Sequence, residues 1–462
     1  MSVLYPTLLL CAYGFFSNLR PLEPFLTPYL LGPDQNLTES QVVGEIFPVW
    51  TYSYLLLLFP TFLATDYLRY KPVLVLQATS LVVTYVLLLK ARGVLAMQFL
   101  EFFFGLATAS DVAYYSYIYS VVEAKHYQKV TSYCRSVTLL GSAAGSLTGQ
   151  LLLSVGKLQL RHLLIVTLTS FAVAFVGPWF LPMPKRSLFF HKSPGTAEDI
   201  QHNSNFPESR VPLNQDVSEQ SKAGSPPRAF TKVLHTLWDD FLQCYKCGPL
   251  LAWSLWWALA TCGYFQVINY AQPLWESIRP SHEHDIYNGY VETLSTLLGA
   301  LAALLVGYLP ICWSLWGELS LCVLSFLMAA CIFVMDTRNN IWLCYGFYIL
   351  FRATYMLLIT VATYQIAANL NMQRYALVFG VNTFMALLLQ TLITVVVVDS
   401  AGLGLDIKTQ FFIYGGFFVV ISLVFLMAGL WTATRRRAEQ EVLANMCTET
   451  DSPPVRDASG CR

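Results

Sequence analysis

One acid and several tyrosines recur at helical spacing in residues 106–122, a stretch that otherwise carries no charge. Asp111 is the acid, and Tyr114, Tyr115 and Tyr119 follow it. On an α-helix these spacings place all four side chains on one face. A carboxylate near the middle of a membrane helix costs roughly 2.5 kcal/mol or more, so its presence there indicates a function. An acid beside aromatic faces is suited to hold a flat, positively charged molecule.

Two further acids, Glu23 and Glu292, lie inside apolar stretches. Each would be costly if it faced lipid, so we interpret both as candidate substrate contacts. The alternative for each acid is a buried structural ion pair with a nearby base. The candidate bases are Arg20, Arg135 and Arg352. Glu101 lies near the start of its apolar stretch, and we interpret it as structural.

Aromatic and amide side chains accompany these acids. Phe47 and Trp50 lie in residues 42–66, and Asn269 lies in residues 247–275 beside several aromatic residues. A single tryptophan or tyrosine in a membrane protein ordinarily packs or lies at the lipid interface. Trp50, however, is well inside its apolar stretch. We therefore add Phe47, Trp50 and Asn269 to the candidate substrate site.

The composition is that of a polytopic membrane protein. Of the 462 residues, 55% are hydrophobic and 12% are charged, whereas soluble domains carry about 25% charged residues. The formal net charge is zero, so the bulk charge suggests no nucleic-acid partner. The sequence has no Walker A or nucleophile motif, and its histidines lie outside the centres of the apolar stretches. We therefore expect neither an ATP-driven pump nor an enzyme, and no metal or cofactor.

Twelve apolar stretches are long enough to span a bilayer, which takes about 20 residues. They cover residues 5–31, 42–66, 72–90, 96–122, 128–154, 160–181, 247–275, 287–309, 314–335, 341–367, 374–398 and 409–434. The sequence therefore predicts an all-α membrane protein with twelve transmembrane helices. The first stretch contains Pro21 and Pro24, which predict a broken helix. Such a break is tolerated only where it lines a cavity or is buried in protein.

A polar stretch divides the spans into two sets of six. Residues 183–245 show little hydrophobic periodicity, and we expect a largely disordered cytoplasmic linker. The predicted N-terminal half is 1–182, the C-terminal half is 246–435, and residues 436–462 form a cytoplasmic tail. A 6+6 arrangement with a polar central loop is typical of the major facilitator superfamily architecture.

Charged residues at the ends of the spans predict the orientation and a gate. Arg69 follows the second span and residues 435–437 are three arginines after the last, so the positive-inside rule places both termini in the cytoplasm. Asp66 and Arg69 could latch the cytoplasmic face by pairing; plain positive-inside anchoring is an equally weighted alternative. Asn36 begins the only N-glycosylation sequon and falls in an extracellular loop in this orientation, so we expect it to be glycosylated.

Six long stretches carry a family resemblance. They are residues 14–30, 32–38, 47–54, 65–72, 127–135 and 375–384. They resemble the reduced folate carrier family (solute carrier family 19), and in particular its thiamine-carrying branch. The resemblance covers nearly all of both six-span halves and fails in the linker and the tail. It implies facilitated or proton-coupled uptake of a vitamin across the plasma membrane.

The resemblance also implies site residues. In the thiamine branch, acids and aromatics at positions matching Glu23, Phe47, Trp50, Asp111 and Tyr114 hold the substrate. Position 111 departs from the family, which usually has a glutamate there; aspartate keeps the charge but is shorter by one methylene.

Residues at two other positions argue against a folate substrate. The folate branch has basic residues where this chain has Glu123 and Gln390. Their absence counts against an anionic substrate.

Three hypotheses stay open. The first is a thiamine carrier working by alternating access around a central cavity, with pyridoxine-like cations as further substrates and a proton coupled through Glu23 or Glu292. The second is a carrier of folate or other organic anions, which Arg135 and Arg352 would favour. The third is a multi-span receptor or scaffold without transport. The expected partners are the transported substrate, membrane lipid and protons, with no nucleic acid.

Overall fold

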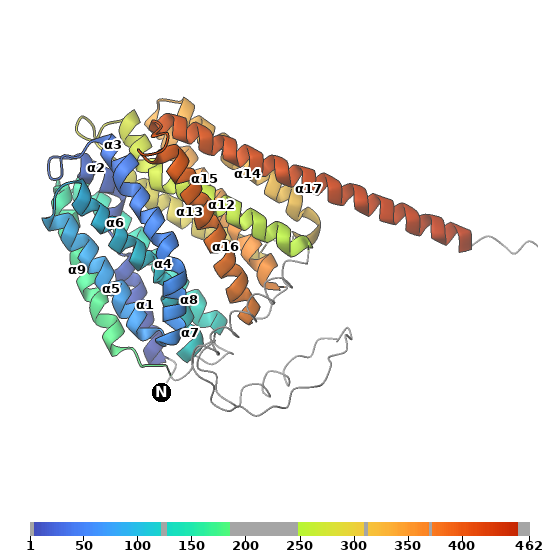
Figure 1. Ribbon diagram of the computed structural model, residues 1–462, viewed down its shortest axis with the longest axis horizontal. Helices are drawn as coiled ribbons and strands as arrows, with labels where there is room; N and C mark the ends of the chain where they lie inside the picture. Colours follow the sequence, from blue (N-terminus) through green and yellow to red (C-terminus); the bar gives the residue numbers. More distant parts are fainter. Residues whose placement is uncertain (1–3, 122–126, 185–247, 309–312, 369–371, 451–462) are drawn as a thin grey trace, which may run out of the picture.

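The computed structural model describes residues 4–121, 127–184, 248–308, 313–368 and 372–450. This part of the chain is helical throughout, with two groups of helices side by side, α1 to α9 and α12 to α17 (Figure 1). The predicted linker, residues 183–245, lies almost entirely outside the described residues.

The N-terminal group begins with a broken span and contains four long helices. Its elements are α1 (Leu4–Asn18), η1 (Glu23–Phe25), α2 (Leu26–Leu31), α3 (Glu39–Gln41), η2 (Val42–Ile46), α4 (Phe47–Tyr67), α5 (Lys71–Lys90), α6 (Val94–Ala109), α7 (Asp111–Val121), α8 (Tyr127–Ser154) and α9 (Leu160–Phe180). The C-terminal group has six long helices. Its elements are α12 (Gly248–Ile278), α13 (Asn288–Tyr308), α14 (Trp313–Thr337), α15 (Ile341–Ala368), α16 (Met372–Ile393), η4 (Thr394–Val398) and α17 (Ile407–Thr450).

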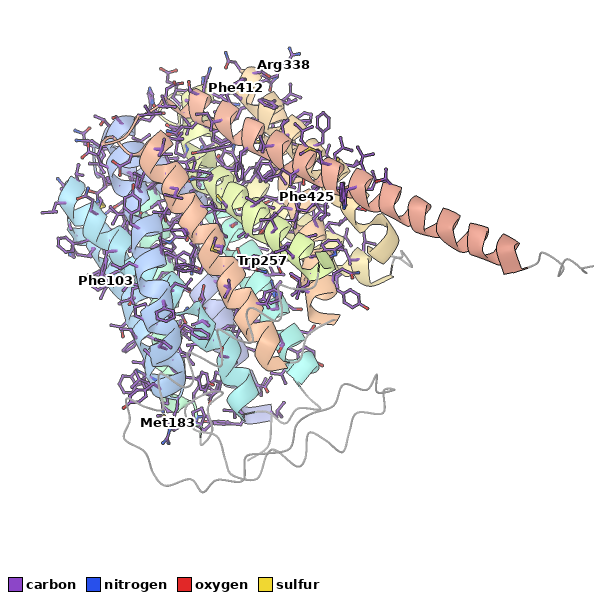
Figure 2. All side chains as sticks on the ribbon, turned by 45° about the vertical axis from the view of Figure 1, so that its right-hand side comes forward. Phe103, Met183, Trp257, Arg338, Phe412 and Phe425 are labelled. Atoms are coloured by element: carbon purple, nitrogen blue, oxygen red, sulfur yellow. The ribbon has the colours of Figure 1, made fainter. Side chains whose placement is uncertain are left out.

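The prediction of an all-helical membrane protein is confirmed. Within the described residues, ten helical segments are long and apolar enough to cross a membrane. The two expected spans outside this set are the first, which is divided between α1 and α2, and the seventh, which is the continuous helix α12. Exposed apolar side chains surround the bundle, whose opposite ends are marked by Arg338 and Met183 (Figure 2).

Two helix boundaries differ from the expectation. The fourth span is interrupted at Ser110, so Asp111 is the first residue of a new helix, α7. The Ser110 hydroxyl donates to the carbonyl of Leu106, and such back-bonding tends to bend helices. The last helix runs to Thr450 instead of ending near residue 434. The reason is local, because residues 435–450 contain good helix formers and no proline or glycine.

The break in the first span is held by close packing on α8. Gly141, Gly145 and Gly149 recur every four residues and face the chain around the break. A Cβ on Gly145 would lie 2.5 Å from the backbone nitrogen of Arg20. Small residues at this spacing let membrane helices approach backbone to backbone. The glycine ridge, Gly141, Gly145 and Gly149, therefore sets the position of residues 15–21.

The two groups of helices meet along α8 with α13 and along α4 with α16. At the end of the bundle that bears α2 and α3, hydrogen bonds also join them directly (Figure 1). Gln150 on α8 donates to the carbonyl of Ile286 (2.8 Å) and accepts from the backbone N–H of Gly289 (2.9 Å). The Tyr52 hydroxyl donates to Asp399 at 2.6 Å. We call this the Asn36 end, and it is closed by contacts between the halves.

Candidate functional site

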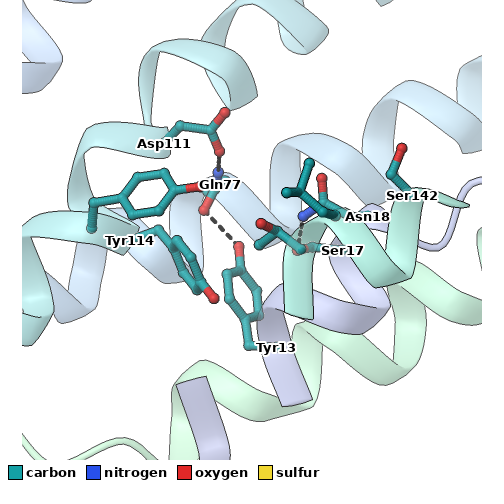
Figure 3. A pocket seen from close by; sticks show the side chains of 10 residues that line it. Tyr13, Ser17, Asn18, Gln77, Asp111, Tyr114 and Ser142 are labelled. Atoms are coloured by element: carbon teal, nitrogen blue, oxygen red, sulfur yellow. Dashed lines mark hydrogen bonds between the residues drawn. The ribbon is translucent and has the colours of Figure 1, made fainter. Parts of the chain in front are cut away.

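A cavity of about 180 Å³ opens within the N-terminal group (Figure 3). Four helices supply its walls: α1, α5, α7 and α8. The lining residues are Tyr13, Ser17, Asn18, Gln77, Asp111, Tyr114, Tyr115, Thr138, Leu139 and Ser142. The helical face predicted from the spacing of Asp111, Tyr114 and Tyr115 thus faces a cavity and not lipid. The side chain of Tyr119 lies outside the described part of the chain.

Asp111 is exposed within this cavity and is oriented by a hydrogen-bonded relay. The amide of Gln77 donates to Asp111 Oδ1, and the Tyr13 hydroxyl donates to Gln77 Oε1 at 2.7 Å. Gln77 and Tyr13 are both buried, so their positions are set by packing. Among the described residues none donates to Asp111 Oδ2, so this oxygen is available to a ligand. Spacing along the sequence could not reveal this arrangement, because Gln77 lies on a different helix.

Tyrosine rings form one wall of the cavity. Tyr114 and Tyr115 pack edge to face with centroids 5.0 Å apart, and Tyr13 lies 5.9 Å from Tyr114. The Tyr114 hydroxyl donates to the carbonyl of Leu10, which fixes α7 against α1. Tyr114 is buried, whereas Tyr115 is partly exposed. A flat ligand beside Asp111 would therefore meet Tyr115 first.

Glu23 lies at the break in the first span. Its carboxylate pairs with Arg20 at 3.4 Å and accepts from the Tyr85 hydroxyl at 3.3 Å. The Arg20 guanidinium also lies 5.5 Å from the ring centroid of Phe104, in cation–π contact. Arg20 is close enough to interact electrostatically with both Glu23 and Asp111. One guanidinium is therefore within electrostatic reach of both predicted acids.

Glu101 is a third acid in this region, and the sequence interpretation had set it aside as structural. It is only 4% exposed, and no described cation forms an ion pair with it. Glu101 lies within electrostatic reach of Glu23. An unpaired charge is costly to bury, so Glu101 adds no free charge here. Glu23 and Asp111 are the two acids within electrostatic reach of Arg20, a formal excess of one negative charge. Because the fourth span is interrupted at Ser110, Glu101 lies in the middle of α6, whose sequence contains no other acid or base, and that isolation was the available signal.

The predicted aromatic residues of α4 lie apart from the Asp111 cavity. Trp50 Nε1 donates to the Thr108 hydroxyl at 3.2 Å, and its ring packs edge to face on Phe265 of α12. The Phe47 and Tyr270 rings are 6.3 Å apart. The two ring contacts cross from one half to the other, whereas the Trp50 hydrogen bond stays within the N-terminal half. Neither Trp50 nor Phe47 lines the Asp111 cavity.

Asn269 lies on α12, one residue before Tyr270, and is partly exposed. Like the α4 aromatics, it does not line the Asp111 cavity. The helix that carries Asn269 contacts the predicted aromatic residues of α4 through Phe265 and Tyr270 at the junction of the halves.

Glu292 is engaged in an ion pair in the C-terminal half. Arg352 Nη1 contacts Glu292 Oε2 directly and donates to the Ser295 hydroxyl at 2.9 Å. The Tyr348 hydroxyl donates to the other carboxylate oxygen at 2.7 Å. The two charged side chains are 19% and 16% exposed. A substrate cation at Glu292 would have to displace Arg352.

The remaining predicted residues lie at the ends of the bundle. Arg69 follows α4 in a turn with a positive φ of 58°, while the side chain of Asp66 lies outside the described part of the chain. Asn36 is exposed in the loop between α2 and α3. Thr38, the third residue of the sequon, caps α3 by accepting from the Gln41 N–H.

Comparison with known proteins gives both a family and a fold. The sequence model of the family described as Reduced folate carrier matches residues 1–413. Mouse Thiamine transporter 1 is 58% identical over 455 residues, which cover 94% of this chain and 91% of that protein. The human Reduced folate transporter is 38% identical over 435 residues, covering 92% and 72%. The solved structure of the POT family transporter PepTSo superposes with a TM-score of 0.63 at 13% identity, covering 92% and 97%. That likeness confirms the architecture of a major facilitator transporter.

Proposed function

The chain belongs to the reduced folate carrier family, and on that premise we propose that it carries thiamine across the plasma membrane by alternating access. It is a membrane transporter and not an enzyme. The greater identity to a thiamine transporter, 58% against 38% for a folate transporter, supports the cationic vitamin. The same comparison makes the receptor or scaffold alternative unnecessary.

The observation that carries this proposal is the excess of carboxylates around one guanidinium. Thiamine joins a positively charged thiazolium ring to an aminopyrimidine ring. The acids Glu23 and Asp111 would attract the cation, and a desolvated site strengthens that attraction. The aromatic rings beside Asp111 and at the junction of the halves can stack on either ring of the substrate.

We assign the contacts as follows. Asp111 Oδ2 accepts a hydrogen bond from the aminopyrimidine, which lies against Tyr115. The thiazolium ring lies toward Glu23, where its charge competes with Arg20 for the carboxylate. Trp50 and Phe47 close over the substrate when the halves approach. Support for this arrangement is that Asp111 Oδ2 accepts no hydrogen bond from a described residue and that Arg20 is within electrostatic reach of both acids.

Three residues keep less direct assignments. Asn269 extends the site from α12. Glu292 contacts substrate only in a state in which its pair with Arg352 has opened, so we place it second to the acids of the N-terminal half. A coupled proton would use Glu23 before Glu292, because Glu23 is the more exposed of the two, at 41% against 19%.

The topology that accompanies this proposal has twelve spans. Residues 1–182 and 246–435 form the halves, with α1 and α2 together as the first span and α12 as the seventh. Both termini are cytoplasmic, so the Asn36 end is extracellular and Asn36 carries a glycan. Asp66 and Arg69 then lie at the cytoplasmic end as a gate.

The folate alternative has one structural feature to recommend it, the bases Arg352 and Arg135. Arg352, however, is already neutralised by Glu292, and Arg135 is exposed on α8. Pyridoxine-like cations would fit the same acids, and direct competition with thiamine tests them.

Uptake by the variants Asp111→Asn and Asp111→Glu tests the proposal. Cells expressing each variant would be offered labelled thiamine or a reduced folate, with uptake corrected for surface protein. A hydrogen bond to a charged group contributes about 1.5–3 kcal/mol, so Asp111→Asn should lose roughly 10- to 150-fold in thiamine affinity. Asp111→Glu, which keeps the charge, is the matched control. Undiminished thiamine uptake by Asp111→Asn, or a preference for folate, would overturn the assignment.

A further inference from the structure

The broken first span leaves backbone groups without their usual helical partners. In an unbroken α-helix the N–H of residue i+4 donates to the carbonyl of residue i. Pro28 has no N–H, so the carbonyl of Pro24 cannot receive its bond. Phe25 leaves the helical conformation with φ −120° and ψ 18°, which disturbs the neighbouring pair, Thr27 and Glu23. Buried backbone groups of this kind need other partners.

The side chain of Gln272 on α12 forms hydrogen bonds with the backbone of both Thr27 and Glu23. Its Nε2 donates to the carbonyl of Glu23 at 2.9 Å, and its Oε1 accepts from the N–H of Thr27 at 3.2 Å. The side-chain amide thus bridges the two groups that an unbroken helix would join to each other. Gln272 belongs to the C-terminal half, so these replacement hydrogen bonds cross the interface between the halves.

Asn288, the first residue of α13, forms a hydrogen bond with the backbone of Pro24. Its Nδ2 donates to the Pro24 carbonyl at 3.0 Å, which replaces the N–H that Pro28 lacks. Its Oδ1 accepts from the Tyr345 hydroxyl at 2.8 Å, and this bond fixes which way the amide points. Asn288 is 2% exposed and Tyr345 is 5% exposed, so water does not compete for these groups.

We propose that Gln272 and Asn288 are positioning residues that complete the broken helix from the opposite half and so stabilise the carrier with its Asn36 end closed. The inference rests on the proposed alternating access. Opening this end moves α12 and α13 away from η1 and α2, so the Pro24 carbonyl and the Thr27 N–H lose these partners. The Glu23 carbonyl keeps its bond from the Leu26 N–H but loses the one from Gln272, so closure also helps to set the position of a proposed substrate acid.

Other contacts limit the size of the effect. Gln150 and Tyr52 join the halves at the same end through their own hydrogen bonds. Removing one amide should therefore shift the equilibrium between open and closed states without abolishing closure. A buried hydrogen bond contributes about 1 kcal/mol net, or about five-fold in an equilibrium constant. Gln272→Leu removes two such bonds, so the open population should rise about 5- to 30-fold.

Thiol labelling from outside the cell measures this population without any substrate. Ser142→Cys places a reporter in the Asp111 cavity, which an impermeant maleimide reaches only when the Asn36 end is open. The background from native cysteines is measured in the chain without the reporter. Gln272→Leu should speed labelling of the reporter about five-fold or more. Asn288→Asp, which keeps the acceptor for Tyr345 but loses the donor to Pro24, should speed it about five-fold.

The matched control is Gln98→Leu. Gln98 donates to the carbonyl of Glu45 within the N-terminal half, so its loss should leave the labelling rate unchanged. If Gln272→Leu fails to reach the surface, Asn288→Asp decides the matter. An unchanged or slower rate in a surface-expressed Gln272 or Asn288 variant would overturn the inference. Labelling measures opening of the Asn36 end without thiamine. A failure of thiamine uptake would therefore not change the labelling rates, and the two failures are distinguishable.

Discussion

Replacing Gly145 by alanine tests the close packing that holds the break in the first span. The new Cβ would lie 2.5 Å from the backbone nitrogen of Arg20 and 3.2 Å from the carbonyl carbon of Leu19. Both contacts are with backbone, which cannot rotate away as a side chain can. Overpacking of this kind costs about 1–3 kcal/mol. The same displacement moves the Arg20 and Glu23 pair, so transport should suffer along with stability.

Gly346→Ala is the matched control. Gly346 also lies inside a long helix, α15, but nothing lies within 4 Å of the Cβ that alanine would add. Both variants gain the helix propensity of alanine over glycine, about 0.5–1 kcal/mol. That gain cancels between them, so their difference in stability should be the overpacking cost alone, about 1–3 kcal/mol.

The assay is heat inactivation of detergent-purified protein, followed as the fraction that remains monodisperse. Because unfolding of such proteins is usually irreversible, both variants must be heated at one scan rate. We expect Gly145→Ala to lose its fold at a lower temperature than wild type and Gly346→Ala to match or exceed wild type. Thiamine uptake per surface molecule should fall only for Gly145→Ala. Equal midpoints for the two variants would refute the packing argument for the glycine ridge.

Two other predictions follow from the ion pair and the sequon. Glu292→Gln or Arg352→Gln alone leaves a buried unpaired charge, which costs about 3–5 kcal/mol. Each single variant should therefore reduce surface expression, and the double variant should restore it. A double variant that expresses normally but carries no thiamine would show that Glu292 contacts the substrate. Asn36→Gln should remove a glycan and so speed migration on a denaturing gel. The control is Thr38→Ser, which keeps both the sequon and the cap of α3. Unchanged migration of Asn36→Gln would refute glycosylation at this site.

Local patterns in the chain were sufficient for the spans and for one face of the site. A bilayer requires about 20 apolar residues per helix, so composition along the chain predicts where helices lie. Asp111, Tyr114 and Tyr115 share a cavity because positions three and four apart on a helix face the same way. The two prolines at 21 and 24 likewise predicted a break that the structure contains.

Partners from distant parts of the chain could not be predicted in the same way. Sequence reasoning named Glu292 and Arg352 but could not decide that they pair, and it dismissed Glu101. Gln77, which orients Asp111, is an unremarkable polar residue in an apolar helix. Each of these roles depends on which helices become neighbours, and no local periodicity contains that information.

The sequence by itself determined that this protein is a helical membrane protein with costly acids among aromatic residues. Local hydrophobicity and helical spacing are enough for that, since both act over a few residues. Only the tertiary structure decided which partners those acids have: Arg20 is within electrostatic reach of Asp111 and Glu23, Glu292 is neutralised, and amides of one half complete the broken helix of the other. Packing of helices far apart in the chain decides which charges remain unpaired, and an unpaired buried charge is what a cationic substrate can bind.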